Sequence, residues 1–155
     1  MKASYSQKEK VKMTVEKDLS KSVVFPVDSK ITNDFFIGDA YLDMIIPEPT
    51  ASTGAAGNVT FAPGARNNWH VHEIGQTLLV TGGEGWYQEE GKVAEKLVAG
   101  DIKVIPAGIN HWHGATSNSW FVHIAIAPGS TTWNGQVDDE QYADAEAGKI
   151  VMENK

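Results

Sequence analysis

The chain has 155 residues, the usual length of one domain, and this is enough to bury one hydrophobic core. It has no cysteine, which excludes disulfides, thiolate metal sites and cysteine nucleophiles, so any metal must bind to nitrogen and oxygen atoms. The net charge is −7, although residues 1–22 carry six lysines against three acids. The remaining body is therefore strongly acidic and repels nucleic acid. We interpret residues 1–22 as an N-terminal arm, expected to be solvated or frayed, and residues 23–155 as a single domain.

Membrane spans and export signals are not expected. The longest apolar runs, such as Met44 to Ile46 and Leu78 to Val80, are far shorter than the roughly 20 residues of a membrane-spanning helix. The lysines near the amino terminus are not followed by a continuous apolar stretch, as they would be in a secretory signal. We therefore expect a cytoplasmic protein.

From about residue 22 onward, short β-rich runs alternate with glycine and proline at intervals of about ten residues. This pattern predicts an all-β sandwich or closed barrel. The predicted strands, in chain order, are 34–46, 57–62, 69–71, 77–81, 85–89, 94–98, 102–105, 111–115 and 120–127. The first of these is the longest, which suits an edge strand or an exchange between two barrels. Because an exposed edge is a liability, we expect a homodimer.

Turn-forming residues separate several of these runs. Gly82 to Gly85 and Glu90-Gly91 lie between apolar segments, and Pro106 to Gly108 separates two more. We predict hairpins at these places. The single helix signal comes near the end, where Asp138 can cap a first turn and Gly148 can close the last. A short C-terminal helix is expected to pack outside the barrel.

The five histidines form the most informative pattern. Four of them occur in two pairs with the same spacing, His70 with His72 and His111 with His113, and the fifth is His123. Residues two apart in a strand point to the same face, so each pair places two imidazoles on one side of its strand. Both pairs can therefore face one cavity.

Gln76 extends this pattern by one more polar group. It begins the run Gln76, Leu78 and Val80, whose members have the same parity and point to one face if the run is a strand. A turn at Glu73 to Gly75 would bring this strand beside the first histidine pair. The glutamine is then expected in the same cavity.

At this point the sequence resembles the cupin superfamily. The first cupin motif is matched by GARNNWHVHEIGQ at residues 64–76 with a glycine at 82, and the second by GDIKVIPAGINH at residues 100–111. The resemblance covers about residues 57–127, with both motifs in order. It implies a double-stranded β-helix, or jelly-roll, barrel. Two positions differ from the superfamily pattern, with Gln76 in place of glutamate and Ala115 in place of asparagine.

The resemblance implies one divalent metal ion per chain, held by His70, His72, Gln76 and His111. The segments GQTLLVTGGEGW, HWHGA and WNGQVDDEQY are similar to those of small manganese-binding cupins that resemble bacterial hydroxynitrile lyases, some with relatives described beside carboxymuconolactone decarboxylases. Mn(II) is therefore favoured, while Fe(II), Zn(II) and Ni(II) also suit imidazole and amide donors.

The same resemblance implies that His113 and His123 would act in acid–base catalysis or orient the ligands. The resemblance implies a small-molecule substrate and a lyase that uses the metal as a Lewis acid and His113 or His123 as the base. An Fe(II) or Mn(II) dioxygenase and a non-catalytic ligand-binding barrel are the alternatives. In the last case both histidines would be structural.

Five other residues carry expectations. Trp69 and Trp112 alternate with the histidines and should point away from the cavity, where they would pack against a neighbouring element. Arg66 is expected in a surface salt bridge. Asn67 and Ala127 fall where relatives of this kind place pocket residues.

Overall fold

The computed structural model describes residues 24–47 and 54–155. The predicted arm at residues 1–22 lies outside the described residues. In chain order, the elements are β1 (Ser29–Lys30), β2 (Phe36–Ile37), β3 (Ala40–Ile46), β4 (Ala55–Phe61), β5 (Arg66–Asn67), β6 (His70–His72), β7 (Gln76–Glu89), β8 (Glu95–Val98), β9 (Ile102–Ile105), β10 (His111–Ala115), β11 (Phe121–Ala127), β12 (Thr131–Trp133) and α2 (Asp139–Glu146).

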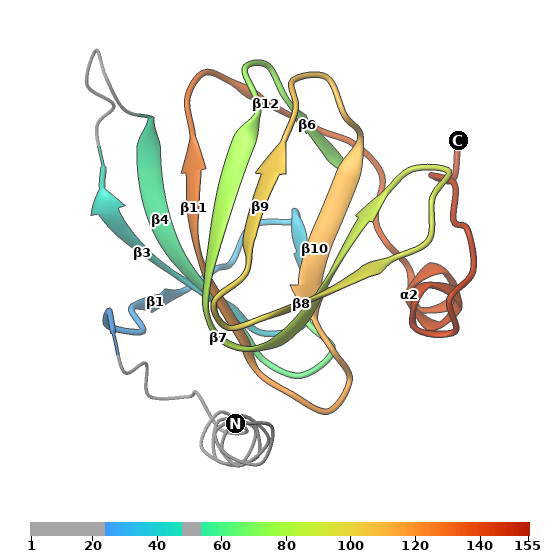
Figure 1. The fold of residues 1–155 in the computed structure, drawn as a ribbon, viewed down its shortest axis with the longest axis horizontal. Helices are drawn as coiled ribbons and strands as arrows, with labels where there is room; N and C mark the ends of the chain where they lie inside the picture. The colour runs from blue at the N-terminus through green and yellow to red at the C-terminus, as the bar shows by residue number, and fades with distance from the viewer. Residues whose placement is uncertain (1–23, 48–53) are drawn as a thin grey trace, which may run out of the picture.

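The strands form one curled antiparallel sheet whose two halves close around a common interior (Figure 1). The main path of neighbouring strands is β1-β3-β4-β11-β7-β10-β5-β2, while β12 and β6 continue from β10, and β8 and β9 pair with β7. The predicted all-β barrel is confirmed. Its interior is filled by apolar side chains that include Phe61, Leu78 and Phe121, all completely buried.

Strand β7 corrects one prediction. Residues 77–81 and 85–89 are not two strands joined by a hairpin at Gly82 to Gly85, because β7 runs without a break from residue 76 to residue 89. Its first half pairs with β11 and its second half with β10. The glycines permit close approach instead of a turn: a Cβ on Gly83 would overlap the Trp120 carbonyl oxygen. One long strand therefore belongs to both halves of the barrel.

The predicted strand at 34–46 is also corrected. Gly38 has a φ of +80°, and a Cβ on it would lie 2.9 Å from the Cα atom of Ala65, so the chain bends sharply there. The bend separates β2, which pairs with β5, from β3, which pairs with β1 and β4. Strands β1, β5 and β12 were not predicted, because two or three residues are too few to show a periodic pattern.

The C-terminal helix agrees with its prediction. The Asp138 side chain accepts a hydrogen bond from the Gln141 backbone N–H at 2.8 Å, and Gly148 follows the helix with a φ of +76°. Helix α2 lies outside the barrel beside β8 and β10 (Figure 1). In the part of the chain that the structure describes, no helix is both long and apolar enough to cross a membrane.

The helix covers the outer face of the strands that carry the histidine pairs. Trp69 and Trp112 are fully buried there against Tyr142 and Ala145, which confirms that both tryptophans point away from the interior. The Trp69 indole N–H donates to the Gln141 side-chain oxygen at 3.2 Å. This packing fixes the strands on which the histidines stand.

Arg66 lies under the start of the same helix. The expected salt bridge is present, with Nη2 2.8 Å from the Asp139 carboxylate, but the arginine side chain is only 6% exposed, so it is not a surface residue. Its Nε also donates to the Val137 carbonyl at 2.9 Å, and the guanidinium lies 4.7 Å from the centre of the Tyr142 ring. Arg66 therefore fastens the C-terminal segment to β5.

Candidate metal centre

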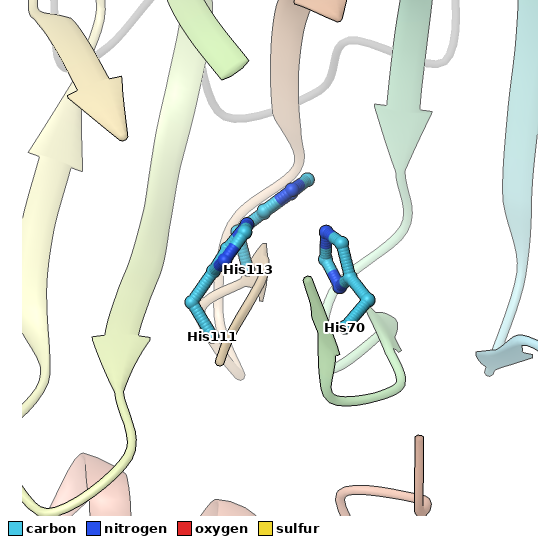
Figure 2. Close-up of side chains that lie close together, drawn as sticks. All are labelled: His70, His111 and His113. Carbon is cyan, nitrogen blue, oxygen red and sulfur yellow. The ribbon is translucent and has the colours of Figure 1, made fainter. Parts of the chain in front are cut away.

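Strands β6 and β10 bring the two histidine pairs together. His70 is paired directly with His111 in the antiparallel register, and their ring centroids are 4.2 Å apart. The ring of His72 lies 5.0 Å from His70 and 5.5 Å from His111. Figure 2 shows the imidazoles of His70, His111 and His113 turned toward one another from the two strands. One nitrogen from each of these three lies within 4.8 Å of the others, so the cluster could hold a metal ion.

Backbone carbonyls fix the orientation of two of these rings. The Nδ1 atom of His70 is 2.8 Å from the Asn68 oxygen, and that of His111 is 2.8 Å from the Ile109 oxygen. A carbonyl can only accept, so Nδ1 carries the proton in both rings and Nε2 keeps its lone pair. His72 has a similar anchor, with its Nδ1 3.0 Å from the Thr131 hydroxyl. These are the contacts that orient imidazole ligands in metalloproteins.

Three buried atoms near these rings, each with a lone pair to donate to a metal, have no hydrogen-bond partner among the described residues. They are the Nε2 atoms of His72 and His111 and the Oε1 atom of Gln76. A buried polar atom without a partner costs about 1–3 kcal/mol, so three in one place require an explanation. A divalent metal ion accepts lone pairs from imidazole nitrogens and amide oxygens, so these three atoms fit a site for one such ion.

A tight turn places Gln76 at the cluster. Gly75, with a φ of +104°, approaches β9 so closely that a Cβ would lie 2.6 Å from the Ile105 oxygen. Gln76 follows as the first residue of β7 and is buried together with Leu78 and Val80. The predicted parity of these three residues is confirmed.

Burial keeps all five imidazoles neutral. It lowers the pKa of His111 to about 4 and that of His123 to about 3. Burial also lowers the pKa of His72, against a smaller opposing effect of the Gln76 amide, and places those of His70 and His113 well below the usual 6.5. A metal binds the neutral imidazole, so no proton has to be displaced at neutral pH.

His113 differs from the other clustered histidines, because both its ring nitrogens have neighbours. Its Nδ1 lies 3.0 Å from the Nε2 atom of His123, and the Asn67 amide nitrogen is 3.3 Å from each of its ring nitrogens. The structure therefore brings together the two histidines for which the sequence suggested acid–base roles. Sequence alone could not show this contact, since His123 stands on β11 and β11 is not paired with β10.

A cavity of about 120 Å³ adjoins the cluster. Its lining consists of aromatic, aliphatic, amide and imidazole groups, and none of the described lining residues carries a full charge at neutral pH. These residues are Phe36, Val59, Phe61, Asn67, His70, His72, Gln76, His113, His123, Ala125 and Trp133.

The sequence predicted the polar side of this cavity better than its apolar side. Asn67 was expected in the pocket and lies in its lining, whereas Ala127 was expected there and does not. Phe36, Phe61 and Trp133 were not expected in it. Trp133 stacks on Phe35, with ring centroids 4.7 Å apart, and comes from β12, a strand too short to be predicted.

Comparison with known proteins decides the family. Residues 57–127 match the family described as a cupin domain. The chain is also 41% identical over 113 residues to the (R)-mandelonitrile lyase of Granulicella tundricola, a match that covers 70% of this chain and 86% of that protein. This chain belongs to the cupin family. The resemblance drawn from the two histidine motifs is confirmed.

Solved structures agree with this cupin assignment. A cupin-like protein from Thermotoga maritima is 40% identical, with a TM-score of 0.76, and the match covers 81% of this cupin and 98% of that chain. A predicted oxalate decarboxylase from the same organism is 19% identical with a TM-score of 0.58, covering 68% of this cupin and 100% of that chain. A DMSP lyase from Ruegeria pomeroyi is 19% identical with a TM-score of 0.51, and the match covers 65% of this cupin and 52% of that chain. The last two share only the fold with this cupin.

Proposed function

We propose that this cupin is a metal-dependent lyase that cleaves small, uncharged 2-hydroxynitriles. The observation that carries the proposal is a set of three buried lone-pair atoms, on His72, Gln76 and His111, that have no hydrogen-bond partner among the described residues. His72 and Gln76 line the same cavity as the hydrogen-bonded pair of His113 and His123, and His111 lies directly beside it. The similarity to a mandelonitrile lyase supports the reaction type. An ion site beside an acid–base pair in an apolar cavity is what such a cleavage needs.

We propose His70, His72, Gln76 and His111 as the ligands of one divalent ion. His113 is left out because its ring nitrogens already face His123 and Asn67, although one of them is close enough to join the cluster. Mn(II) is our first choice, and Fe(II), Zn(II) and Ni(II) suit the same donors. Four neutral donors leave the positive charge of a bound ion uncompensated, so it would supply strong Lewis acidity toward a substrate hydroxyl oxygen.

The chain's own residues would handle the proton. A neutral imidazole of the His113–His123 pair accepts the hydroxyl proton as the substrate oxygen forms its carbonyl double bond. The bond between the hydroxyl-bearing carbon and the nitrile carbon breaks, and the nitrile group leaves as cyanide with the bonding electrons. Return of the proton to cyanide gives hydrogen cyanide and an aldehyde. The histidine pair ends in its starting state.

The cavity lining would select the substrate. Phe36, Phe61 and Trp133 offer apolar surface for the aldehyde-derived part of the molecule, and the volume of about 120 Å³ suits a small one. Since the described residues of the lining include no lysine or arginine, a carboxylate on the substrate would find no side-chain counter-ion among them. Small aromatic or branched hydroxynitriles are therefore the proposed substrate class.

Benzaldehyde release from mandelonitrile tests this proposal. Metal-free protein is reloaded separately with manganese, iron and zinc, and metal content is measured in the wild type and in His113→Ala and His123→Ala. We expect turnover with a bound metal and loss of turnover in a variant that still holds the metal. Full metal binding without turnover for any ion would refute the lyase proposal. Oxygen uptake by the iron-loaded protein would then favour the dioxygenase alternative.

A homodimer and a cytoplasmic location remain predictions from the sequence. Ile102 and Val104 on β9 are both 67% exposed, and a dimer interface would cover apolar side chains of this kind. Light scattering during gel filtration would measure the mass. A monomer at micromolar concentration would contradict the dimer.

A further inference from the structure

The three histidines among the proposed ligands are anchored in two different ways. His70 and His111 are each held through Nδ1 by the backbone carbonyl of the residue two positions earlier in the chain. His72 is held instead by a side chain from a distant part of the sequence, since its Nδ1 lies 3.0 Å from the hydroxyl oxygen of Thr131. A backbone carbonyl is present whatever the side chain is, whereas this hydroxyl depends on the identity of residue 131.

Strand β12 lies directly against the first histidine pair. In its antiparallel ladder with β6, Thr131 is opposite His72 and Trp133 is opposite His70. Side chains that are directly opposite in such a ladder lie on the same face, so the hydroxyl and the indole both lie beside the imidazoles. The ring centroids of Trp133 and His70 are 4.7 Å apart, which agrees with this arrangement. One short strand therefore contacts both histidines of the pair.

Strand β12 is fastened to its neighbour at both ends. Before it, the Glu73 carboxylate accepts the Ser130 hydroxyl at 2.8 Å and the Ser130 backbone N–H at 3.3 Å. After it, the Asn134 N–H donates to the Trp69 carbonyl at 2.8 Å. Thr131 is also β-branched, which restricts its χ1 angle. The position of the hydroxyl is thus set by the fastened strand and by the stiffness of its own side chain.

A contact at one nitrogen of an imidazole also fixes the direction of the other. While Nδ1 of His72 is at the hydroxyl, its Nε2 is buried and has no hydrogen-bond partner among the described residues. The Oε1 atom of Gln76 is in the same condition, and both residues line the cavity beside the cluster. An unanchored ring would lose rotational freedom about χ2 when it binds a metal, whereas an anchored ring has already lost it. The anchor should therefore increase metal affinity.

We infer that Thr131 is a positioning residue of the metal site, whose hydroxyl orients the His72 ring and keeps Nε2 available to the metal. The inference rests on the proposed function for its set of ligands, and it does not depend on the reaction catalysed there. Among the anchors of the three ligand histidines, this is the one that a side-chain substitution can remove. Loss of such a contact typically lowers metal affinity by about 10- to 100-fold.

The Mn(II) affinity of three variants tests the inference. Thr131→Val has nearly the shape of threonine and lacks the hydroxyl, whereas Thr131→Ser keeps it. Thr132→Val makes the same change at the next position, where the side chain is exposed and lies on the opposite face of β12. Competition with a chelator should show binding about 10- to 100-fold weaker in Thr131→Val than in the wild type. Thr131→Ser should recover most of this loss, and Thr132→Val should show no loss.

Stability and activity are measured separately. Valine suits a strand, so metal-free Thr131→Val should unfold near the wild-type temperature, and its lower affinity would then not reflect a folding defect. Absence of lyase activity together with the expected affinities would refute the function and leave the role of Thr131 intact. Wild-type affinity in Thr131→Val, or an equal loss in Thr131→Ser or Thr132→Val, would overturn the inference whatever the activity. A wild-type protein that binds no divalent ion would overturn both.

Discussion

Gln76 is the residue that distinguishes this site from the glutamate form of the cupin motif. Among the described residues, its buried Oε1 has no hydrogen-bond partner, and none of the residues that line the cavity with it carries a full charge. A neutral amide leaves the charge of a bound ion undiminished, whereas a carboxylate would cancel one unit. Under the proposed function, strong polarisation of the substrate would thus be obtained at the expense of metal affinity.

Replacement of Gln76 by glutamate should reverse that balance. We expect Gln76→Glu to bind Mn(II) at least about tenfold more tightly, because a carboxylate adds direct attraction to the cation. The same variant should show a lower kcat on mandelonitrile. Competition with a chelator measures the affinity, and Gln136→Glu, which adds the same charge at an exposed position, is the control. Unchanged affinity would mean that residue 76 does not touch the ion.

The polar residues of the site were largely predictable from the sequence, and the reason is local. Alternation along a strand places His70 with His72 and Gln76 with Leu78 on the same face, whatever the strand pairs with. The contact between His113 and His123 is not local. It depends on how β7 passes between β10 and β11, with a register shift at Val122/His123. Five residues of sequence around His123 contain no trace of that shift.

At the scale of elements, β7 organises the barrel. It contacts β11 and β9 with its first part and β10 and β8 with its second, so the two halves of the sheet share it. The segment from Gly82 to Gly85 has the composition of a hairpin turn, and its sequence predicts one. The glycines are needed instead because the Trp120 carbonyl and the Phe121 ring lie where side chains would be. Close approach by a distant strand leaves the same glycine signature as a turn.

Two glycine substitutions distinguish a glycine required for backbone conformation from one required for the close approach of a neighbouring strand. Gly83→Ala should destabilise the fold by about 2–4 kcal/mol, because the new methyl group would overlap the Trp120 carbonyl and because φ is +70°. Gly108→Ala has a similar φ of +79° but nothing within 4 Å of the new Cβ, so it should cost only about 1 kcal/mol. Urea unfolding gives both values. Equal losses would show that backbone conformation alone determines the cost.

At the scale of the whole molecule, the buried histidines couple stability to pH. The unfolded chain protonates them near pH 6.5, whereas in the folded protein the pKa is about 4 for His111 and about 3 for His123. Below about pH 6.5 the unfolded state therefore binds more protons, and the free energy of unfolding falls as the pH falls. Each histidine contributes about 1.4 kcal/mol per pH unit until its folded pKa is reached.

Denaturant unfolding of the metal-free protein between about pH 7 and pH 4 measures this slope. The variant His123→Gln should reduce the slope of the unfolding free energy by about 1.4 kcal/mol per pH unit. This reduction applies between the pKa of His123 in the unfolded chain and its pKa in the folded protein. A stability that does not change across this range in the wild type would mean that the imidazoles are less buried than the structure shows.

The proposed metal site is defined by the side chains that hold the ion, and calorimetric titration of metal-free protein with Mn(II) identifies them. We predict one ion per chain in the wild type, loss of that binding in His72→Ala, and near wild-type binding in His113→Ala. Retained binding in His72→Ala together with its loss in His113→Ala would contradict the proposed ligand set. The ion would then belong to the cluster of His70, His111 and His113, and the acid–base pair would not be free to act.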